Sequence, residues 1–275
     1  MARGEAPEAG EGPPWVGGRF EVIELVGSGG AGNVYRVRDH ERGDDAALKV
    51  AHDMTVADPR LRRRFEQEAE LLAAMDHPGV LALRAWSGAD APRPWMATDF
   101  CPGGSLVDHL RAAGVPEAEE VAEWALQLLD ALSYLHGRKM LHRDIKPENV
   151  LVDGHGCAVL ADFGVARKPS SRATRRGDLF GTPAYMAPEQ LDDVTAATPS
   201  SDLYSVGALL FALVTQRPCD ALLTDRARQL ARLPAPLRPV VARATELAPD
   251  ARYAGADAMA ADLADALEQL AASPG

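Results

Sequence analysis

The chain has 275 residues, 47% of them hydrophobic, so it is long enough to bury a sizeable core in one two-lobed domain or two small domains. Its 29 basic and 40 acidic residues give a net charge of −11. That balance disfavours nucleic acid as the main partner, because phosphate binding needs a basic surface.

The three cysteines, at positions 101, 157 and 219, lie far apart and form no CxxC pair. This spacing argues against a disulfide framework or a zinc site and fits a reducing compartment, so we expect a cytoplasmic protein. Residues 1–18 are rich in Gly, Pro and Glu, so we expect a disordered tail. This segment opens without the apolar stretch that a signal peptide contains, so we expect no signal peptide.

Alternating apolar and polar residues predict a mostly antiparallel sheet in the first part of the chain. The expected strands cover residues 19–26, 33–39, 46–50, 80–86 and 94–100. A helix is predicted from about Pro59 to Met75, with Phe65, Ala69 and Leu72 on one face.

The sequence changes character after residue 101. An amphipathic helix is predicted over 116–137, a short hairpin over 150–160, and mostly helical structure from 199 onward. The apolar run 203–215 is too short to cross a bilayer and predicts a buried helix, so no membrane partner is expected. A β-rich lobe followed by an α-rich lobe would place a cleft near residues 98–103.

The segment GSGGAGNV, residues 27–34, has Gly27, Gly29 and Gly32 in G-x-G-x-x-G spacing. Glycines allow backbone N–H groups to approach phosphates closely. A dinucleotide fingerprint would need a helix after the third glycine, but a period-two strand follows. A kinase-type phosphate loop and a simple flexible hairpin both remain open, and each predicts a strand–loop–strand arrangement.

Lys49 lies between apolar neighbours in a predicted strand, where a charge is costly unless it is paired. Alternation places Ala47 and Lys49 on one face of this strand and Leu48 on the other. Glu68, in the predicted helix, is the best candidate for the anionic partner of Lys49. The alternative is a lysine that extends from an edge strand into solvent.

Four motifs follow in order: LHRDIKPENV at 141–150, ADFGVA at 161–166, GTPAYMAPE at 181–189 and SDLYSVG at 201–207. The order and spacing of these motifs over about residues 20–265 closely resemble those of the protein kinase family. The residues within the motifs resemble those of the bacterial eukaryotic-like serine/threonine kinases. The resemblance implies an α+β, bilobal kinase domain over 19–270. Its antiparallel β N-lobe would cover about 19–99 and its mainly helical C-lobe about 102–270.

The resemblance also implies roles for five residues in phosphoryl transfer from ATP to Ser/Thr hydroxyls of protein substrates. Asp144 would orient the substrate hydroxyl and accept its proton, and Lys146 would neutralise charge on the moving phosphoryl group. Asn149 and Asp162 would hold Mg²⁺, and Lys49 would bind the α/β-phosphates. Mg²⁺ takes only one or two protein oxygens beside phosphate and water, so this ligand set suffices.

Further residues would bind the nucleotide because they fall in register with these motifs. Thr98 takes the gatekeeper position, and backbone atoms of Asp99 and Cys101 would meet the adenine edge. The ring and phosphates would also contact Val26, Gly27, Ser28, Gly29, Gly30, Gly32, Val34, Ala47 and Leu151.

Residues 162–189 would form an activation segment. The resemblance implies that Arg143 pairs with a phosphorylated residue there, and Thr174 is our main candidate for autophosphorylation, with Ser170 and Ser171 as alternatives. A transient homodimer would be expected for that reaction.

Three structural roles are also implied. Glu189 and Arg252 would form an ion pair, Asp202 would anchor the catalytic loop, and His142 with Phe163 would pack in the core. A pseudokinase scaffold that binds nucleotide without turnover is the main alternative, although none of its expected losses occurs here. A small-molecule kinase is a third alternative, disfavoured by GTPAYMAPE, which builds a peptide-binding ledge.

Overall fold

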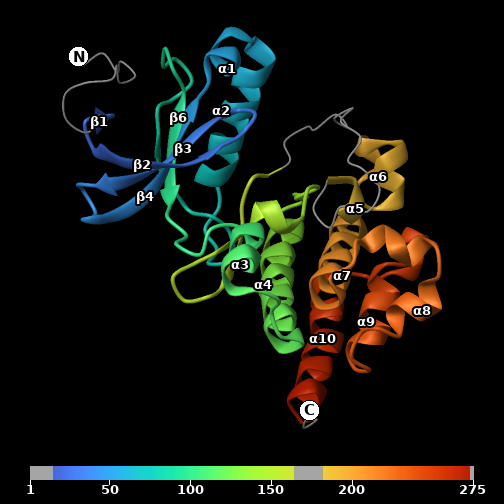
Figure 1. Cartoon of the computed structure of the whole chain (residues 1–275). Coiled ribbons are helices and arrows are strands. Elements are labelled where there is room, and N and C mark those ends of the chain that lie inside the picture. Colours follow the sequence, from blue (N-terminus) through green and yellow to red (C-terminus); the bar gives the residue numbers. More distant parts are fainter. Residues whose placement is uncertain (1–14, 164–181, 273–275) are drawn as a thin grey trace. The chain divides into compact units, whose positions relative to one another are not determined.

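A computed structural model of the chain describes residues 15–163 and 182–272 (Figure 1). The chain divides into two compact units. The N-terminal unit extends to His77 and resumes over Leu81–Cys101, and the C-terminal unit comprises Pro78–Val80 and the chain from Pro102 onward. The observed elements, a sheet followed by helices, agree with the α+β class expected from the sequence.

The N-terminal unit is built on a six-stranded sheet in the order β1-β2-β3-β4-β6-β5, in which every neighbouring pair is antiparallel. The strands are β1 Trp15–Val16, β2 Phe20–Ser28, β3 Gly32–Asp39, β4 Asp44–Ala51, β5 Leu83–Trp86 and β6 Trp95–Asp99. Strand β1, only two residues long, is too short to give an alternating pattern and was not predicted. It lies within the tail 1–18 that was expected to be disordered, so that expectation is wrong for residues 15–18, which pair with or turn into β2.

The predicted strand over 80–86 is wrong at its start. Strand β5 begins only at Leu83, and Val80 forms an isolated parallel bridge with Leu160 in the C-terminal unit. The backbone N–H of Leu160 also donates to the carbonyl of Gly79 at 2.9 Å. The apolar run 80–86 is therefore divided between a bridge in the C-terminal unit and strand β5 in the N-terminal unit, and the alternating pattern alone could not show where the division falls.

The two faces of the sheet have different roles. One face carries a small core of Phe20, Val37, Ala46, Leu48 and Ala97, all fully buried. On the other face, Lys49 meets helix α2, Pro59–Ala73, which lies with α1, Asp53–Ala57, beside the sheet (Figure 1).

Helix α2 begins at a proline behind an aspartate cap: the side chain of Asp58 accepts from the backbone N–H of Arg60 at 2.8 Å. Its buried residues include Phe65, Ala69 and Leu72, so the predicted face is confirmed. Helix α1 was not predicted, because five residues are too few for a helical period.

The C-terminal unit is mainly helical and contains one hairpin, β7 Val150–Val152 with β8 Ala158–Leu160. The helices are α3 Leu106–Ala113, α4 Ala118–Gly137, α5 Thr182–Tyr185, α6 Pro188–Asp192, α7 Pro199–Thr215, α8 Arg226–Leu230, α9 Leu237–Ala244 and α10 Ala256–Ala271. Short 3-10 turns cover Pro147–Asn149, Val194–Ala196, Cys219–Leu223 and Pro249–Ala251.

Helices α4 and α7 form the centre of this unit and contact each other. The apolar residues of α4 that recur at helical spacing are all buried: Val121, Trp124, Leu128, Leu132 and Leu135. Helix α7 is buried throughout 201–213, as its apolar sequence predicts. A Cβ at Gly207 would lie 2.6 Å from Cβ of Ala244, so α7 and α9 approach too closely for any larger residue. Among the described residues no helix is both long and apolar enough to span a membrane.

Candidate active site

The loop before the 3-10 turn Pro147–Asn149 is held by Asp202, which is 1% exposed near the start of α7. Its carboxylate accepts the backbone N–H groups of His142 at 3.0 Å and Arg143 at 2.8 Å, and lies 2.9 Å from Nε2 of His136. The anchoring role expected for Asp202 is therefore confirmed. Arg143 has a positive φ of 67°, a conformation that only a well-fixed loop imposes on a non-glycine residue.

His142 connects this loop to the segment after β8. Its Nε2 lies 3.1 Å from the carbonyl of Ala161, and its Nδ1 lies 3.4 Å from the backbone N–H of Asp144. One nitrogen must therefore donate and the other accept, which is the pattern of a neutral ring. Complete burial lowers the pKa of His142 and favours the same form. The ring packs against Phe163 with centroids 4.9 Å apart, as expected for core residues.

Two of the predicted catalytic residues, Asp144 and Lys146, lie in this loop together with the predicted metal ligand Asn149. Nζ of Lys146 lies 3.0 Å from Oδ2 of Asp144. Nδ2 of Asn149 donates to the same Oδ2 and to the backbone carbonyl of Asp144, both at 2.8 Å. All three side chains are buried. One carboxylate oxygen thus receives both a cation and an amide N–H, which fixes the rotamer of Asp144.

The residues proposed for Mg²⁺ have suitable chemistry. Because Nδ2 of Asn149 is committed to Asp144, its other amide atom, Oδ1, is the one that can face a cation. The carbonyl of Asn149 accepts from the N–H of Ala161 at 2.9 Å, which brings the residue before Asp162 against the catalytic loop. In the described ranges no three His, Cys, Asp or Glu side chains form a metal-binding group. If Asn149 and Asp162 hold a cation, they offer it hard oxygen atoms, which suits a cation that takes its other ligands from phosphate and water.

In the N-terminal unit, Nζ of Lys49 lies 2.9 Å from both carboxylate oxygens of Glu68, so the predicted partner is confirmed. Nζ also lies 5.9 Å from the ring centroid of Phe65 on the same helix. Two neighbouring acids of α2 do not compete for Lys49, because Glu66 pairs with Arg62 and Glu70 is exposed. The ion pair offsets the cost of placing a lysine in the sheet.

The glycine-rich segment joins β2 to β3 as a hairpin, so the predicted strand–loop–strand arrangement is confirmed. Its four glycines differ in how closely other atoms approach them. A Cβ at Gly32 would lie 2.3 Å from the carbonyl oxygen of Val50, so the close approach of β4 requires glycine there. A Cβ at Gly27 or Gly30 would meet nothing within 4 Å, which leaves room beside those residues.

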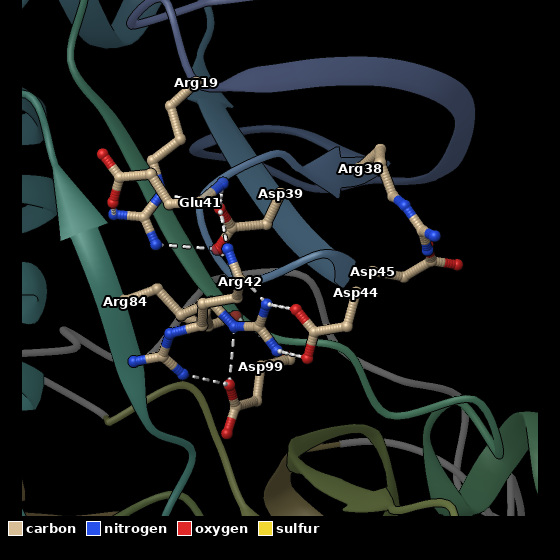
Figure 2. Close-up of polar contacts among 10 residues, drawn as sticks. Arg19, Arg38, Asp39, Glu41, Arg42, Asp44, Asp45, Arg84 and Asp99 are labelled. Atoms are coloured by element: carbon tan, nitrogen blue, oxygen red, sulfur yellow. Dashed lines mark hydrogen bonds and ion pairs between the residues drawn. The ribbon is translucent and has the colours of Figure 1, made fainter.

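The end of β6, where the sequence predicts the adenine contacts, is held by an arginine that sequence analysis missed. Arg84 is only 5% exposed, and its guanidinium lies 2.6 Å from Asp99, 2.6 Å from Asp44 and 3.4 Å from Asp39 (Figure 2). The backbone N–H of Asp99 donates to the carbonyl of Ala82 at 3.0 Å. The only sequence signal was a cation inside an apolar strand, the same signal that identified Lys49.

Figure 2 shows that this network extends to Arg19, whose guanidinium makes two hydrogen bonds of 2.7 Å to the fully buried carboxylate of Asp39. The hydrogen bonds from Arg19 lower the pKa of Asp39 against the opposing effect of burial. The carboxylate also accepts the backbone N–H groups of Glu41 and Arg42. The turn from β3 to β4 and the end of β6 are therefore tied into one rigid frame.

The remaining predicted nucleotide contacts have defined places in their own units. Val34 and Ala47 are half-buried on β3 and β4, and Val26 is exposed on β2. Ser28 ends β2, Gly29 lies in the hairpin loop, Thr98 is buried on β6, and Cys101 closes the N-terminal unit. Leu151 lies on β7, opposite Val159.

The expected phosphorylation sites Ser170, Ser171 and Thr174 lie outside the described residues. The structure does describe the predicted pair beyond them. The guanidinium of Arg252 makes two hydrogen bonds, of 2.7 and 2.8 Å, to the carboxylate of Glu189, so this pair is confirmed.

Comparison with known proteins agrees with this geometry. The family profile described as "Protein kinase domain" matches residues 20–237. The serine/threonine-protein kinase PknL of Mycobacterium tuberculosis is 33% identical over 268 residues, covering 92% of this chain and 67% of that protein. The crystal structure of the M. tuberculosis PknI kinase domain superposes with a TM-score of 0.68 at 26% identity, covering 95% of this chain and 100% of that one.

A further relative is named as a probable serine/threonine-protein kinase of Streptomyces coelicolor, 31% identical over 94% of this chain. The chain spans only 41% of that relative and 34% of the PknB kinase of Mycobacterium leprae. The likeness to these two proteins therefore concerns one part of a longer polypeptide.

Proposed function

Because this chain belongs to the protein kinase family, with named serine/threonine kinases among its relatives, we propose that it transfers the γ-phosphoryl group of ATP to Ser/Thr hydroxyls of protein substrates. The observation that carries this proposal is the buried cluster of Asp144, Lys146 and Asn149, in which two donors meet one carboxylate oxygen. A purely structural role does not account for a buried aspartate and a buried lysine five and three residues before a buried asparagine.

In this proposal the second oxygen of Asp144 accepts the proton of the substrate hydroxyl as that hydroxyl attacks phosphorus. The hydrogen bond from Asn149 and the cation of Lys146 hold the first oxygen, so the second keeps a fixed direction. Lys146 also balances the negative charge that develops on the transferred group.

Asn149 and Asp162 would hold a divalent cation, for which Mg²⁺ fits their oxygen chemistry best, and that cation would supply charge neutralisation at the phosphates. In the N-terminal unit, Lys49 would bind the α/β-phosphates while Glu68 fixes its direction. The hairpin around Gly29 and Gly30 would present backbone N–H groups to the same phosphates.

Phosphate transfer from radiolabelled ATP to a generic basic protein tests the proposal. We expect Asp144→Asn to lower the rate by at least about 10²-fold, the lower end for a lost general base, while nucleotide binding persists. Glu123→Gln, on the exposed surface of α4, is the matched control and should leave the rate unchanged. Equal rates for wild type and Asp144→Asn would refute the assignment, and an inactive wild type that still binds nucleotide would favour the pseudokinase alternative.

Activation by autophosphorylation within 162–189, through a transient homodimer, is part of the same proposal. The motif resemblance and the seryl and threonyl residues of that segment support it. Mass spectrometry of active protein and of Asp144→Asn should find phosphate on the 170–182 peptide only in the active form. An unmodified peptide in fully active enzyme would contradict this part without affecting the transfer reaction.

A further inference from the structure

A cavity of about 610 Å³ opens on the N-terminal unit, and its lining residues are all different from those assigned above to phosphoryl transfer and nucleotide binding. That volume is within the range of small-molecule sites, roughly 300–1,000 Å³. All six strands of the sheet and the connection between β5 and β6 contribute to its lining, which includes Trp15, Val22, Asn33, Tyr35, Val50 and Trp95.

The cavity lies on the face of the sheet opposite Lys49. In β4, Val50 points to the other side from its neighbour, and the strand register pairs Val50 with Asn33 on β3 and with Trp95 on β6. Tyr35, two residues beyond Asn33, shares that face. A ligand here would therefore be separated by the thickness of the sheet from the residues proposed to bind phosphate.

The walls are aromatic and half-buried. Val22, Tyr35, Val50 and Trp95 pack against the small core of this face and are themselves only partly buried. Trp95 makes an edge contact with Phe20, with centroids 5.7 Å apart. These side chains therefore present apolar surface that a bound ligand could contact, whereas the core residues behind them are fully buried.

The polar groups of the cavity are mainly donors. Asn33 donates its amide to the hydroxyl oxygen of Tyr35 at 3.3 Å, which leaves the phenolic hydrogen of Tyr35 able to donate. In the part of the chain that the structure describes, the indole N–H groups of Trp15 and Trp95 donate no hydrogen bond to protein. The carboxylate among the lining residues, Asp53, is already paired with Arg93. Aromatic walls with unused donors suit a flat, apolar molecule that carries hydrogen-bond acceptors.

The cavity is also joined to the glycine-rich hairpin by backbone contacts. His52, on the cavity wall, places Nε2 3.0 Å from the carbonyl of Gly29 and donates its backbone N–H to Ala31 at 3.2 Å. Thr55 donates its hydroxyl to the same Ala31 carbonyl at 2.8 Å. Val50, on the cavity floor, is the residue whose carbonyl closes on Gly32. A shift of residues 50–52 must therefore reach the hairpin.

We propose that this cavity is a regulatory site for a planar aromatic molecule bearing acceptor oxygens, such as an aromatic carboxylate or sulfonate. Occupancy changes the freedom of the hairpin at residues 27–34 through His52 and Val50, and so changes the affinity for nucleotide. Binding itself does not depend on the phosphoryl-transfer proposal; the effect on nucleotide affinity does.

The probe is anilinonaphthalene sulfonate, whose fluorescence rises on binding, added to protein saturated with a hydrolysis-resistant ATP analogue so that nucleotide contacts are blocked. We expect one saturable site, and Val22→Trp, which fills the cavity, should weaken binding at least about tenfold. Ile23→Trp is the matched control, since Ile23 is 51% exposed, adjacent on β2 and not part of the lining. It should bind the probe like wild type.

Tyr35→Phe removes one donor without changing the packing and should weaken the probe roughly fivefold, the worth of one hydrogen bond. This variant keeps the test decisive if Val22→Trp does not fold. Hydrogen exchange should show altered protection in peptides covering 27–34 on probe binding, a readout that needs no kinase activity.

Three results would overturn the proposal. The first is probe binding that Val22→Trp and Tyr35→Phe leave unchanged, and the second is equal weakening by Ile23→Trp. The third is a dimer in sedimentation velocity that Val22→Trp dissociates, because that would assign this face to a second copy of the chain. Unchanged exchange at 27–34 with normal probe binding would refute the regulatory part.

Discussion

The buried guanidinium of Arg252 gives the sharpest test of how the C-terminal unit is held together. Its side chain is 0% exposed, and each of its five N–H bonds has an acceptor. Two go to the carboxylate of Glu189, and the others go to the carbonyls of Ser200 at 3.2 Å, Glu246 at 2.7 Å and Leu247 at 3.1 Å. Burial alone would raise the pKa of Glu189, but hydrogen bonds from Arg252 and Ser201 lower it.

Replacing Arg252 by methionine keeps much of the volume but leaves a partly buried carboxylate and three carbonyls without their donors. Removing one partner of a buried ion pair costs about 3–5 kcal/mol, which is a large share of a typical stability of about 5–15 kcal/mol. Lysine has only three N–H bonds and cannot reproduce the planar fork, so Arg252→Lys should still cost about 2–3 kcal/mol. These magnitudes follow from the count of acceptors, not from charge alone.

The assay is urea unfolding at neutral pH, followed by far-UV circular dichroism. Arg243→Lys is the matched control: its side chain is 50% exposed and 3.6 Å from Asp262, so its loss should be below about 1 kcal/mol. A double variant, Glu189→Leu with Arg252→Met, should recover part of the loss because no charge is then stranded. A loss below about 1 kcal/mol for Arg252→Met would refute the reasoning.

Three further predictions concern the site and its supports. Gly32→Ala should lower thermal stability by an amount worth about 1–3 kcal/mol, since its Cβ would lie 2.3 Å from a carbonyl oxygen, whereas Gly30→Ala meets nothing and should leave the melting temperature within error. In Asp202→Asn, an amide NH₂ group replaces one of the carboxylate oxygens that accept from the backbone N–H groups of His142 and Arg143. We expect kcat to fall about 10- to 100-fold while circular dichroism shows that the fold is retained. An unchanged kcat would contradict this prediction. Burial lowers the pKa of His142 in the folded state, so below the ordinary pKa of 6.5 the unfolded state binds more protons than the folded state. The free energy of unfolding should therefore decrease as the pH is lowered through this range, by up to about 1.4 kcal/mol per pH unit. His142→Phe should show a shallower slope in urea titrations between pH 5 and 7, and an identical slope would count against this source.

The sequence predicted the parts of the site whose chemistry is concentrated within a few residues. Asp144, Lys146 and Asn149 lie within one short loop, so their mutual contacts follow from spacing. Lys49 and Glu68 were paired across 19 residues by strand alternation and helix phase. These are cases in which a charge in an apolar element needs one partner, and few candidates were available.

What the sequence did not predict depends on contacts between distant segments. Arg84 serves three carboxylates on three strands, up to 45 residues away, and no local pattern names them. Val80 was predicted in the strand over 80–86, but it pairs with Leu160 because residues 78–80 pack in the C-terminal unit. The glycine pattern was recognised from the sequence. The reason for glycine at position 32 is that any Cβ there would clash with Val50 on another strand, and no local pattern reveals that contact.

The anchoring of the loop at 142–146 through main-chain groups has a consequence for how this protein could change over generations. Asp202 holds residue 143 by its amide N–H, which every amino acid except proline provides, and the positive φ of 67° there suits glycine or asparagine even better. The side chain at 143 can therefore be exchanged in evolution while the shape of the loop persists. The regulatory role proposed for the side chain of Arg143 and the backbone shape of the loop would therefore be inherited separately.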